Sequence, residues 1–149
     1  MASISGIGVA VLSPLLVLFA CSTAGQQGNA SQTNLPGSTW RLVELRSSDD
    51  AVGVVRPDDP AKYELRLGKD GDAAARLDCN RGAGRWRSEA AGQITFTPMA
   101  MTRAACGAGS LDTRVARELG FVRTYLIEGD RLRLILMADG GSQLWARVP

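Results

Sequence analysis

The sequence predicts an α+β fold: a mostly antiparallel, curled β-sheet with one short amphipathic helix, at about residues 110–120, inserted between strands. Three observations predict it. Apolar and polar side chains alternate along most of residues 39–148, which is typical of strands that bury one face. Glycine-containing turns separate the alternating runs, as in antiparallel hairpins. One segment changes to helical spacing.

The alternating runs have an apolar residue at every second position. They comprise Tyr63, Leu65 and Leu67; Ala73, Ala75, Leu77 and Cys79; Ile94 and Phe96; and Leu132, Leu134 and Leu136. The predicted turns are Asp70-Gly71, Glu128-Gly129-Asp130 and Asp139-Gly140-Gly141. The second run predicts that Cys79 faces inward on a strand. After it, Asn80 suits a left-handed backbone or a hydrogen bond back to the chain. Gly82 and Gly84 are expected to form a tight bend.

The predicted helix carries apolar residues three or four positions apart, at Leu111, Val115, Leu119 and Val122. This stripe is expected to pack on the sheet. Ser110 is the predicted N-cap, and Asp112 lies in the first turn, where the helix dipole favours a carboxylate. The helix is expected to end near residue 120, at a glycine.

The amino-terminal segment is predicted to be a leader, because residues 1–20 carry no charged side chain and are mostly apolar from residue 7 onward. The leader ends in Leu18-Phe19-Ala20-Cys21, which resembles a bacterial lipobox, in which the cysteine sulfur receives a diacylglycerol and further acylation follows. A plain secretory signal and an uncleaved anchor are the alternatives. Residues 22–38 are uncharged and polar, as in a flexible linker. The predicted organisation is a signal peptide at 1–20, a lipidated cysteine and linker at 21–37, and a folded domain at 38–149.

Composition excludes several classes of chemistry. The chain has no histidine, which removes Ser-His-Asp and Cys-His catalysis and imidazole metal ligands. Three cysteines cannot form a four-thiolate zinc site. A net charge of +2 gives no bulk attraction for nucleic acid. We therefore expect no catalytic residue, no metal, no cofactor and no nucleic-acid partner.

Two cysteine-centred stretches, Asp78-Cys79-Asn80-Arg81-Gly82 and 101–106, form the most informative pattern. In an oxidising envelope Cys79 and Cys106 favour a structural disulfide, which would contribute on the order of 3 kcal/mol. Two buried free thiols, or a redox-active pair, are the alternatives. Arg81 and Arg103, one in each stretch, belong either to a ligand site or, as we favour, to structural hydrogen bonding near the bridge.

These stretches also carry a family resemblance. Cys79-Asn80-Arg81, the strand Gly92-Gln93-Ile94-Thr95-Phe96, Ala100-Met101-Thr102-Arg103 with Cys106, a helix, and Gly129-Asp130-Arg131-Leu132-Arg133-Leu134 follow in the order of a META domain. The folded domain thus resembles the HslJ-like heat-shock lipoproteins. The resemblance implies an α+β fold in an envelope protein, loosely linked to stress and drug tolerance, with no established catalytic residue. It marks Asn80, Arg81, Thr102 and Arg103 only as motif or structural positions.

The leading functional hypothesis is a non-enzymatic lipoprotein, anchored through Cys21 to a membrane of the bacterial cell envelope and binding an unidentified envelope protein. The alternative is a small disulfide-linked lipoprotein that inhibits an envelope enzyme or binds a small apolar ligand. The acidic loop 47–60 is either an inhibitory loop or a solvated connector. Residues 107–110 are either an anion site before the helix or, as we favour, a bend.

Overall fold

The structure is a computed structural model that describes residues 35–149. The predictions for the leader, for Cys21 and for most of the linker lie outside these residues. The strands are β1 (Ser38–Arg46), β2 (Val54–Val55), β3 (Tyr63–Leu67), β4 (Asp72–Leu77), β5 (Asn80–Arg87), β6 (Thr95–Phe96), β7 (Ala100–Met101), β8 (Val122–Glu128), β9 (Arg131–Leu136) and β10 (Ser142–Arg147). A 3₁₀ turn spans Pro60–Lys62, and the helix α1 spans Asp112–Leu119.

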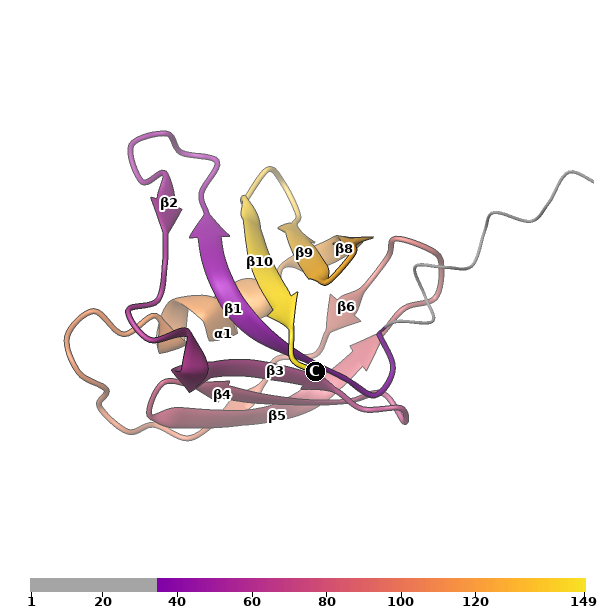
Figure 1. Cartoon of the computed structure of the whole chain (residues 1–149), viewed down its shortest axis with the longest axis horizontal. Helices are drawn as coiled ribbons and strands as arrows, with labels where there is room; N and C mark the ends of the chain where they lie inside the picture. The colour runs from indigo at the N-terminus through magenta and orange to yellow at the C-terminus, as the bar shows by residue number, and fades with distance from the viewer. Residues whose placement is uncertain (1–34) are drawn as a thin grey trace, which may run out of the picture.

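The strands form one curled antiparallel sheet in the order β6-β5-β4-β3-β1-β10-β9-β8, with β2 on β1 and β7 on β5. The long strand β1 belongs to both halves, and its register shifts between Leu42 and Glu44. Such a bulge increases the local bend, and β1 curves from one half of the sheet to the other in Figure 1. The predicted fold class, a curled antiparallel sheet with one short helix, is confirmed.

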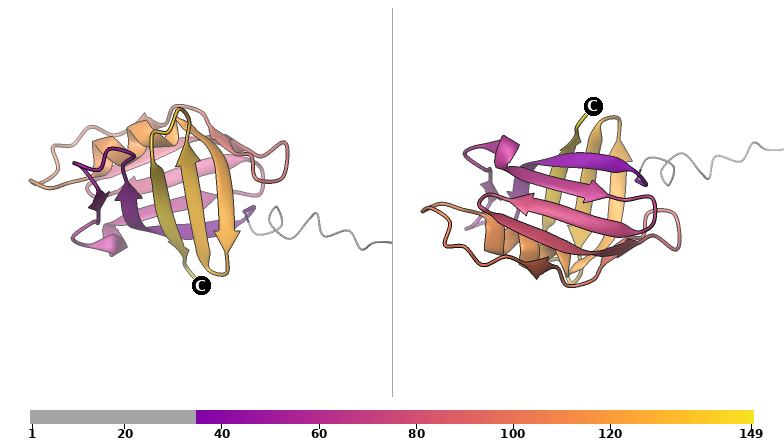
Figure 2. Two further views of the ribbon diagram at one scale, coloured as in Figure 1. Left: turned by 90° about the horizontal axis from the view of Figure 1, so that it is seen from above. Right: turned by 90° about the horizontal axis from the view of Figure 1, so that it is seen from below.

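Backbone hydrogen bonds bring the two ends of the sheet together, so that it is nearly a closed barrel (Figure 2). The Ile94 N–H donates to Arg123 O at 3.0 Å, and the Tyr125 N–H donates to Gly92 O at 2.8 Å. Closure of this kind satisfies strand edges that would otherwise be left unpaired.

The core follows the predicted alternation. Leu65, Leu67, Ala73, Leu77 and their counterparts on β9 are buried, and the three predicted glycine turns join β3 to β4, β8 to β9 and β9 to β10. Trp40 and Trp145 are fully buried at the centre. The core also reaches back to Leu35, which is fully buried, three residues before the boundary predicted at 38.

The helix α1 lies between the two halves of the barrel (Figure 1) and buries Val115 and Leu119 as predicted. It ends at Gly120, as expected, but its N-cap is Leu111 and not Ser110. The Ser110 hydroxyl lies two residues before Asp112 and accepts a long 3.4 Å bond from its N–H. On its inner side the buried Gln143 amide donates to Val115 O at 3.4 Å and to Glu118 Oε2 at 3.2 Å. Within residues 35–149 no helix is long and apolar enough to cross a membrane.

Candidate functional site around the cysteine pair

The two cysteines lie at one end of the β4–β5 hairpin. Leu77 pairs with Asn80, so Asp78 and Cys79 form a two-residue turn. The prediction that Cys79 faces inward on a strand is wrong, because the strand ends at Leu77 and Cys79 is exposed. The turn directs its sulfur outward to Cys106, with 2.01 Å between the Sγ atoms. The disulfide therefore joins the hairpin to the segment that enters α1.

Asp78, and not Asn80, takes the left-handed backbone, with φ 55°. The aspartate can adopt this conformation more readily than most residues because its short side chain bonds locally. Asp78 is held by Lys62: its N–H donates to Lys62 O at 2.9 Å, and Lys62 Nζ lies 3.3 Å from its carboxylate. The predicted left-handed residue is thus displaced by two positions.

We call the contact between the β4–β5 hairpin and residues 102–112 the junction. Asn80 lies at its centre and is 2% exposed. Its Nδ2 donates to Ala104 O at 3.0 Å and to Asp112 Oδ2 at 2.9 Å. Its Oδ1 accepts from the Thr102 hydroxyl at 2.8 Å and from the Ala104 N–H at 2.9 Å. The predicted local hydrogen bond back to the chain is thus replaced by bonds to residues 22 to 32 positions away. One buried amide links β5, the segment after β7 and the helix, which leaves it little capacity to bind anything else.

Asp112 completes the junction from the first turn of α1. Partial burial by itself would raise the pKa of this carboxyl, but hydrogen bonds outweigh it. The amide of Asn80, the Thr113 N–H and the hydroxyls of Ser110 and Thr113 together lower the pKa below its ordinary value. Sequence reasoning placed Asp112 at the helix dipole and missed its bond to Asn80, because only the fold brings positions 80 and 112 together.

The remaining motif residues divide into one that holds the junction and two that face solvent. Thr102 accepts the Arg81 N–H at its hydroxyl, 2.9 Å away, and donates its own N–H to Arg81 O at 2.9 Å. The side chains of Arg81 and Arg103 are exposed, and among residues 35–149 neither makes a side-chain hydrogen bond or ion pair. The expectation that these two side chains are structural hydrogen-bonders is therefore wrong.

Gly82 and Gly84 lie inside β5 and do not form the predicted bend. Their role is to leave room for residues 97–101, which lie across the strand and which we call the crossing segment. A Cβ on Gly82 would collide with Met101 Sδ, and a Cβ on Gly84 would lie 3.2 Å from the Thr97 hydroxyl. The missing side chains let β7 and residues 97–99 lie across the strand, with Met99 and Met101 half-buried against the core.

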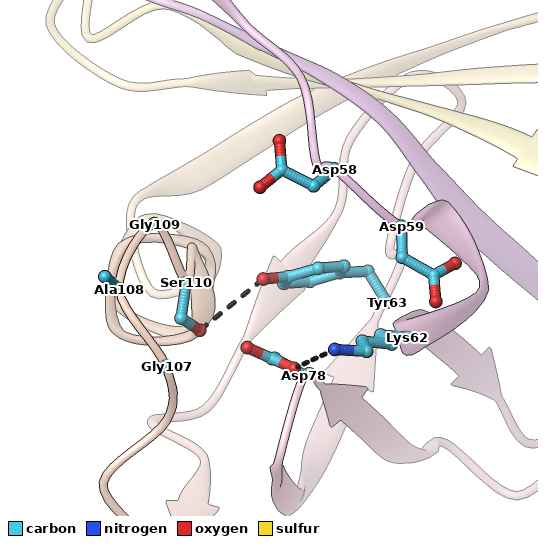
Figure 3. A pocket seen from close by; sticks show the side chains of 9 residues that line it. All are labelled: Asp58, Asp59, Lys62, Tyr63, Asp78, Gly107, Ala108, Gly109 and Ser110. Atoms are coloured by element: carbon cyan, nitrogen blue, oxygen red, sulfur yellow. Dashed lines mark hydrogen bonds and ion pairs between the residues drawn. The ribbon is translucent and has the colours of Figure 1, made fainter.

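Two cavities adjoin the junction. The larger, about 400 Å³, lies between residues 101–105 and α1 and is lined by Met101, Arg103, Ala105, Ala116 and polar atoms of Asn80 and Asp112. The smaller, about 140 Å³, is drawn in Figure 3 and is lined by residues 107–110, Tyr63, Lys62, Asp58, Asp59 and Asp78. Three carboxylates around one lysine repel an anion. Residues 107–110 therefore act as the bend that we favoured, closed by the Leu111 N–H donating to the Tyr63 hydroxyl at 2.9 Å.

Fold and junction together define a class: a small, nearly closed antiparallel barrel with one helix, whose β4–β5 hairpin is joined by a disulfide and an asparagine to the segment before that helix. Comparison with protein families matches the META domain over residues 33–147. The chain therefore belongs to the META domain family, as the sequence resemblance predicted.

Solved structures share the fold at low identity. A protein from Burkholderia xenovorans, solved by NMR, is 19% identical with a TM-score of 0.64, over 91% of this chain and 98% of that one. A DUF4847 family protein from Bacteroides vulgatus is 11% identical with a TM-score of 0.56, over 75% and 93% of the two chains. At this identity the likeness shows the fold alone. Comparison with curated proteins finds no similar protein.

Proposed function

We propose that this protein is a non-enzymatic lipoprotein of the bacterial cell envelope, whose META domain binds an envelope protein and supports tolerance of stress or drugs. The observation that carries the proposal is that the polar side chains and the two cysteines of the junction are bonded to one another. Asn80, Thr102 and Asp112 satisfy one another, and Cys79 is bonded to Cys106. Groups engaged in this way hold a domain together and are poorly placed to act as nucleophile or base. This supports a binding module.

The membrane anchor rests on Cys21, which follows the leader 1–20 and precedes a segment without charged side chains. Acyl chains on this cysteine, typically including palmitate, would give the stable anchoring that one chain alone does not. Replacing Cys21→Ser is expected to abolish incorporation of labelled palmitate and to move the protein from the detergent phase to the aqueous phase. Persistent membrane attachment of the variant without acyl label would contradict the lipid anchor.

The protein partner is tested by crosslinking the lipidated protein in cells and purifying the complexes under denaturing conditions. A recurring envelope protein is the expected product. Recovery of one dominant envelope enzyme would instead favour an inhibitor. A deletion strain that grows normally in heat, detergent and antibiotics would count against the role in stress tolerance.

A second candidate, binding of a small apolar ligand, is favoured by the cavity of about 400 Å³ beside α1. Its walls include Met101 and Ala116, and the exposed Arg103 also lines it. Filling it with Ala116→Trp is expected to abolish binding of an apolar fluorescent probe, whereas Ala90→Trp on an exposed loop leaves binding unchanged. Equal probe binding by both variants would eliminate this cavity as the ligand site.

A further inference from the structure

Strands β1, β3, β4 and β5 form one half of the sheet, and Figure 2 (right) shows them from their outer side. The residues at the outward positions of these strands concentrate positive charge. We call this outer side the arginine face. Its arginines are Arg41, Arg66, Arg76, Arg81, Arg85 and Arg87. The carboxylates at its outward positions are Glu64 and Asp72, so the face carries a surplus of four positive charges. The whole chain has a net charge of only +2, and the rest of the molecule is therefore negative by two. The small net charge conceals this separation.

The strand register sets two of the arginines, Arg76 and Arg81, directly opposite each other. Arg41 pairs with Glu64, Glu64 with Arg76, and Arg76 with Arg81 across β1, β3, β4 and β5. Like charges directly opposite each other on neighbouring strands repel and destabilise a sheet. Arg76 and Arg81 are placed in this way, and both are exposed. An anion between them would relieve the repulsion.

Two arginines of the face have side-chain hydrogen bonds to carbonyl oxygens, Arg76 to Ala61 O and Arg85 to Asp70 O, which leave their charge unneutralised. Asp72 forms an ion pair with Arg85 at 2.7 Å. Among residues 35–149, no ion pair within 4.0 Å involves Arg41, Arg66, Arg76, Arg81 or Arg87. Between them the floor is formed by small residues, including Ala74 and Gly82. They lie in a shallow cavity of about 300 Å³ that is lined by Arg66, Arg76 and Arg81 and by one carboxylate, Glu64, so three positive charges face one negative charge. Guanidinium groups around such a depression match the oxygens of a phosphate.

The chain enters the barrel at one end of this face. Pro36 lies in a shared cavity with Lys69 and Arg87, so the first described residues leave the domain beside two cations. Thirteen residues, 22–34, separate Cys21 from Leu35, a span of at most about 45 Å. A lipid anchor at Cys21 would thus hold the domain close to a surface, with the arginine face next to the point of attachment.

We propose that the arginine face binds the anionic phospholipid head groups of the membrane to which Cys21 is anchored. The choice of a membrane as partner rests on the proposed function, whereas the anion-binding chemistry rests on the face itself. Each basic residue held near an anionic bilayer strengthens binding about fivefold at low salt. The face therefore orients the domain on the membrane and leaves α1 and the cavity beside it directed elsewhere.

The test uses the full chain with Cys21→Ser, so that no acyl chain contributes. Its partition is measured on vesicles of equal parts phosphatidylglycerol and phosphatidylcholine, and on vesicles of phosphatidylcholine alone. The apolar leader is common to all variants. The ratio of the two partition coefficients therefore measures how much the anionic lipid strengthens binding. Replacing Arg66, Arg76 and Arg81 with Gln is expected to lower this ratio about 100-fold. Urea unfolding checks that the variant is folded.

The matched control replaces three exposed arginines elsewhere, Arg117, Arg123 and Arg131, with Gln, which removes the same charge. It is expected to keep most of the parent ratio. An equal fall in both variants, or a parent ratio near one, would overturn the proposal. So would retention of the parent by dextran sulfate without preference for phosphatidylglycerol, since the partner would then be a soluble polyanion. Absence of palmitate on Cys21 refutes the anchor by a separate measurement.

Discussion

The two faces of strand β5 show opposite uses of polar side chains. Asn80 points inward and has four hydrogen bonds to neighbours in the chain between 2.8 and 3.0 Å. Arg81, the next residue, points outward, and its guanidinium has no hydrogen bond or ion pair among residues 35–149. The inward face is satisfied within the domain, while the outward face leaves charged groups exposed to solvent.

This difference teaches where to look for function in this fold. The residues that identify the family, Asn80 and Thr102, hold the hairpin, the crossing segment and the helix together. Their engagement makes them part of the framework. The exposed arginines beside them, Arg81 and Arg103, belong to surfaces that can meet other molecules. Four measurements test this difference between the two faces of β5.

The largest effect is expected from removing the disulfide. The double variant Cys79→Ser, Cys106→Ser opens a loop with a sequence separation of 27, and the loop-entropy relation gives a loss of about 3.5 kcal/mol in the free energy of unfolding. Urea unfolding measures it. Reductant should destabilise the parent protein by a similar amount and leave the variant unaffected. A variant as stable as the parent would show that the hydrogen bonds of Asn80 suffice.

The next largest effect on stability is expected from Asn80→Ala. It leaves Asp112 and the Thr102 hydroxyl without their amide partner in a site that is almost fully buried, at an expected cost of about 2–3 kcal/mol. Arg81→Ala is the matched control, one residue away on the outward face, and should change stability by less than about 0.5 kcal/mol. Similar losses in both variants, measured by urea unfolding, would erase the contrast between the two faces.

Gly82→Ala tests whether the inward side of β5 must stay bare for the crossing segment. The new methyl group would collide with Met101 Sδ, and overpacking of this kind costs about 1–2 kcal/mol. Because a flexible methionine is the obstacle, adding Met101→Ala should recover part of the loss. A double-mutant cycle measures the coupling; a coupling of zero would show that the two residues do not compete for space.

The smallest effect is the pH dependence of Asp112. Its pKa is lowered in the folded state, so its ionised form contributes stability above the ordinary pKa of an aspartate, and this contribution is lost as the pH falls through the lowered pKa. The difference in unfolding free energy between the parent and Asp112→Asn should therefore shrink as the pH falls from about 5, above the ordinary pKa of an aspartate, through the lowered pKa. The exposed Asp130→Asn is the control. A difference that stays constant across this range would contradict the assigned shift.

The sequence predicted the local elements of the fold well. The alternation around Leu65, Leu77 and Leu134, the glycine turns and the stripe on α1 each depend on neighbours along the chain, and the structure confirms them. Three of the failures share one cause. Cys79, Gly82 and the Ser110 cap were assigned by extending a local pattern, but a two-residue turn, a crossing segment and a late helix start interrupted it.

The sequence by itself determined the fold class, the family and the candidate cysteine pair, because residue periodicity and motif order are written along the chain. Only the tertiary structure decided what these residues contact. Strand register placed Arg76 opposite Arg81, and the return of residues 102–112 to β5 gave Asn80 its partners. A local pattern tells which face a side chain occupies. It does not tell which distant strand or helix lies beside it, and that neighbour decides whether a polar group is satisfied or left for a partner.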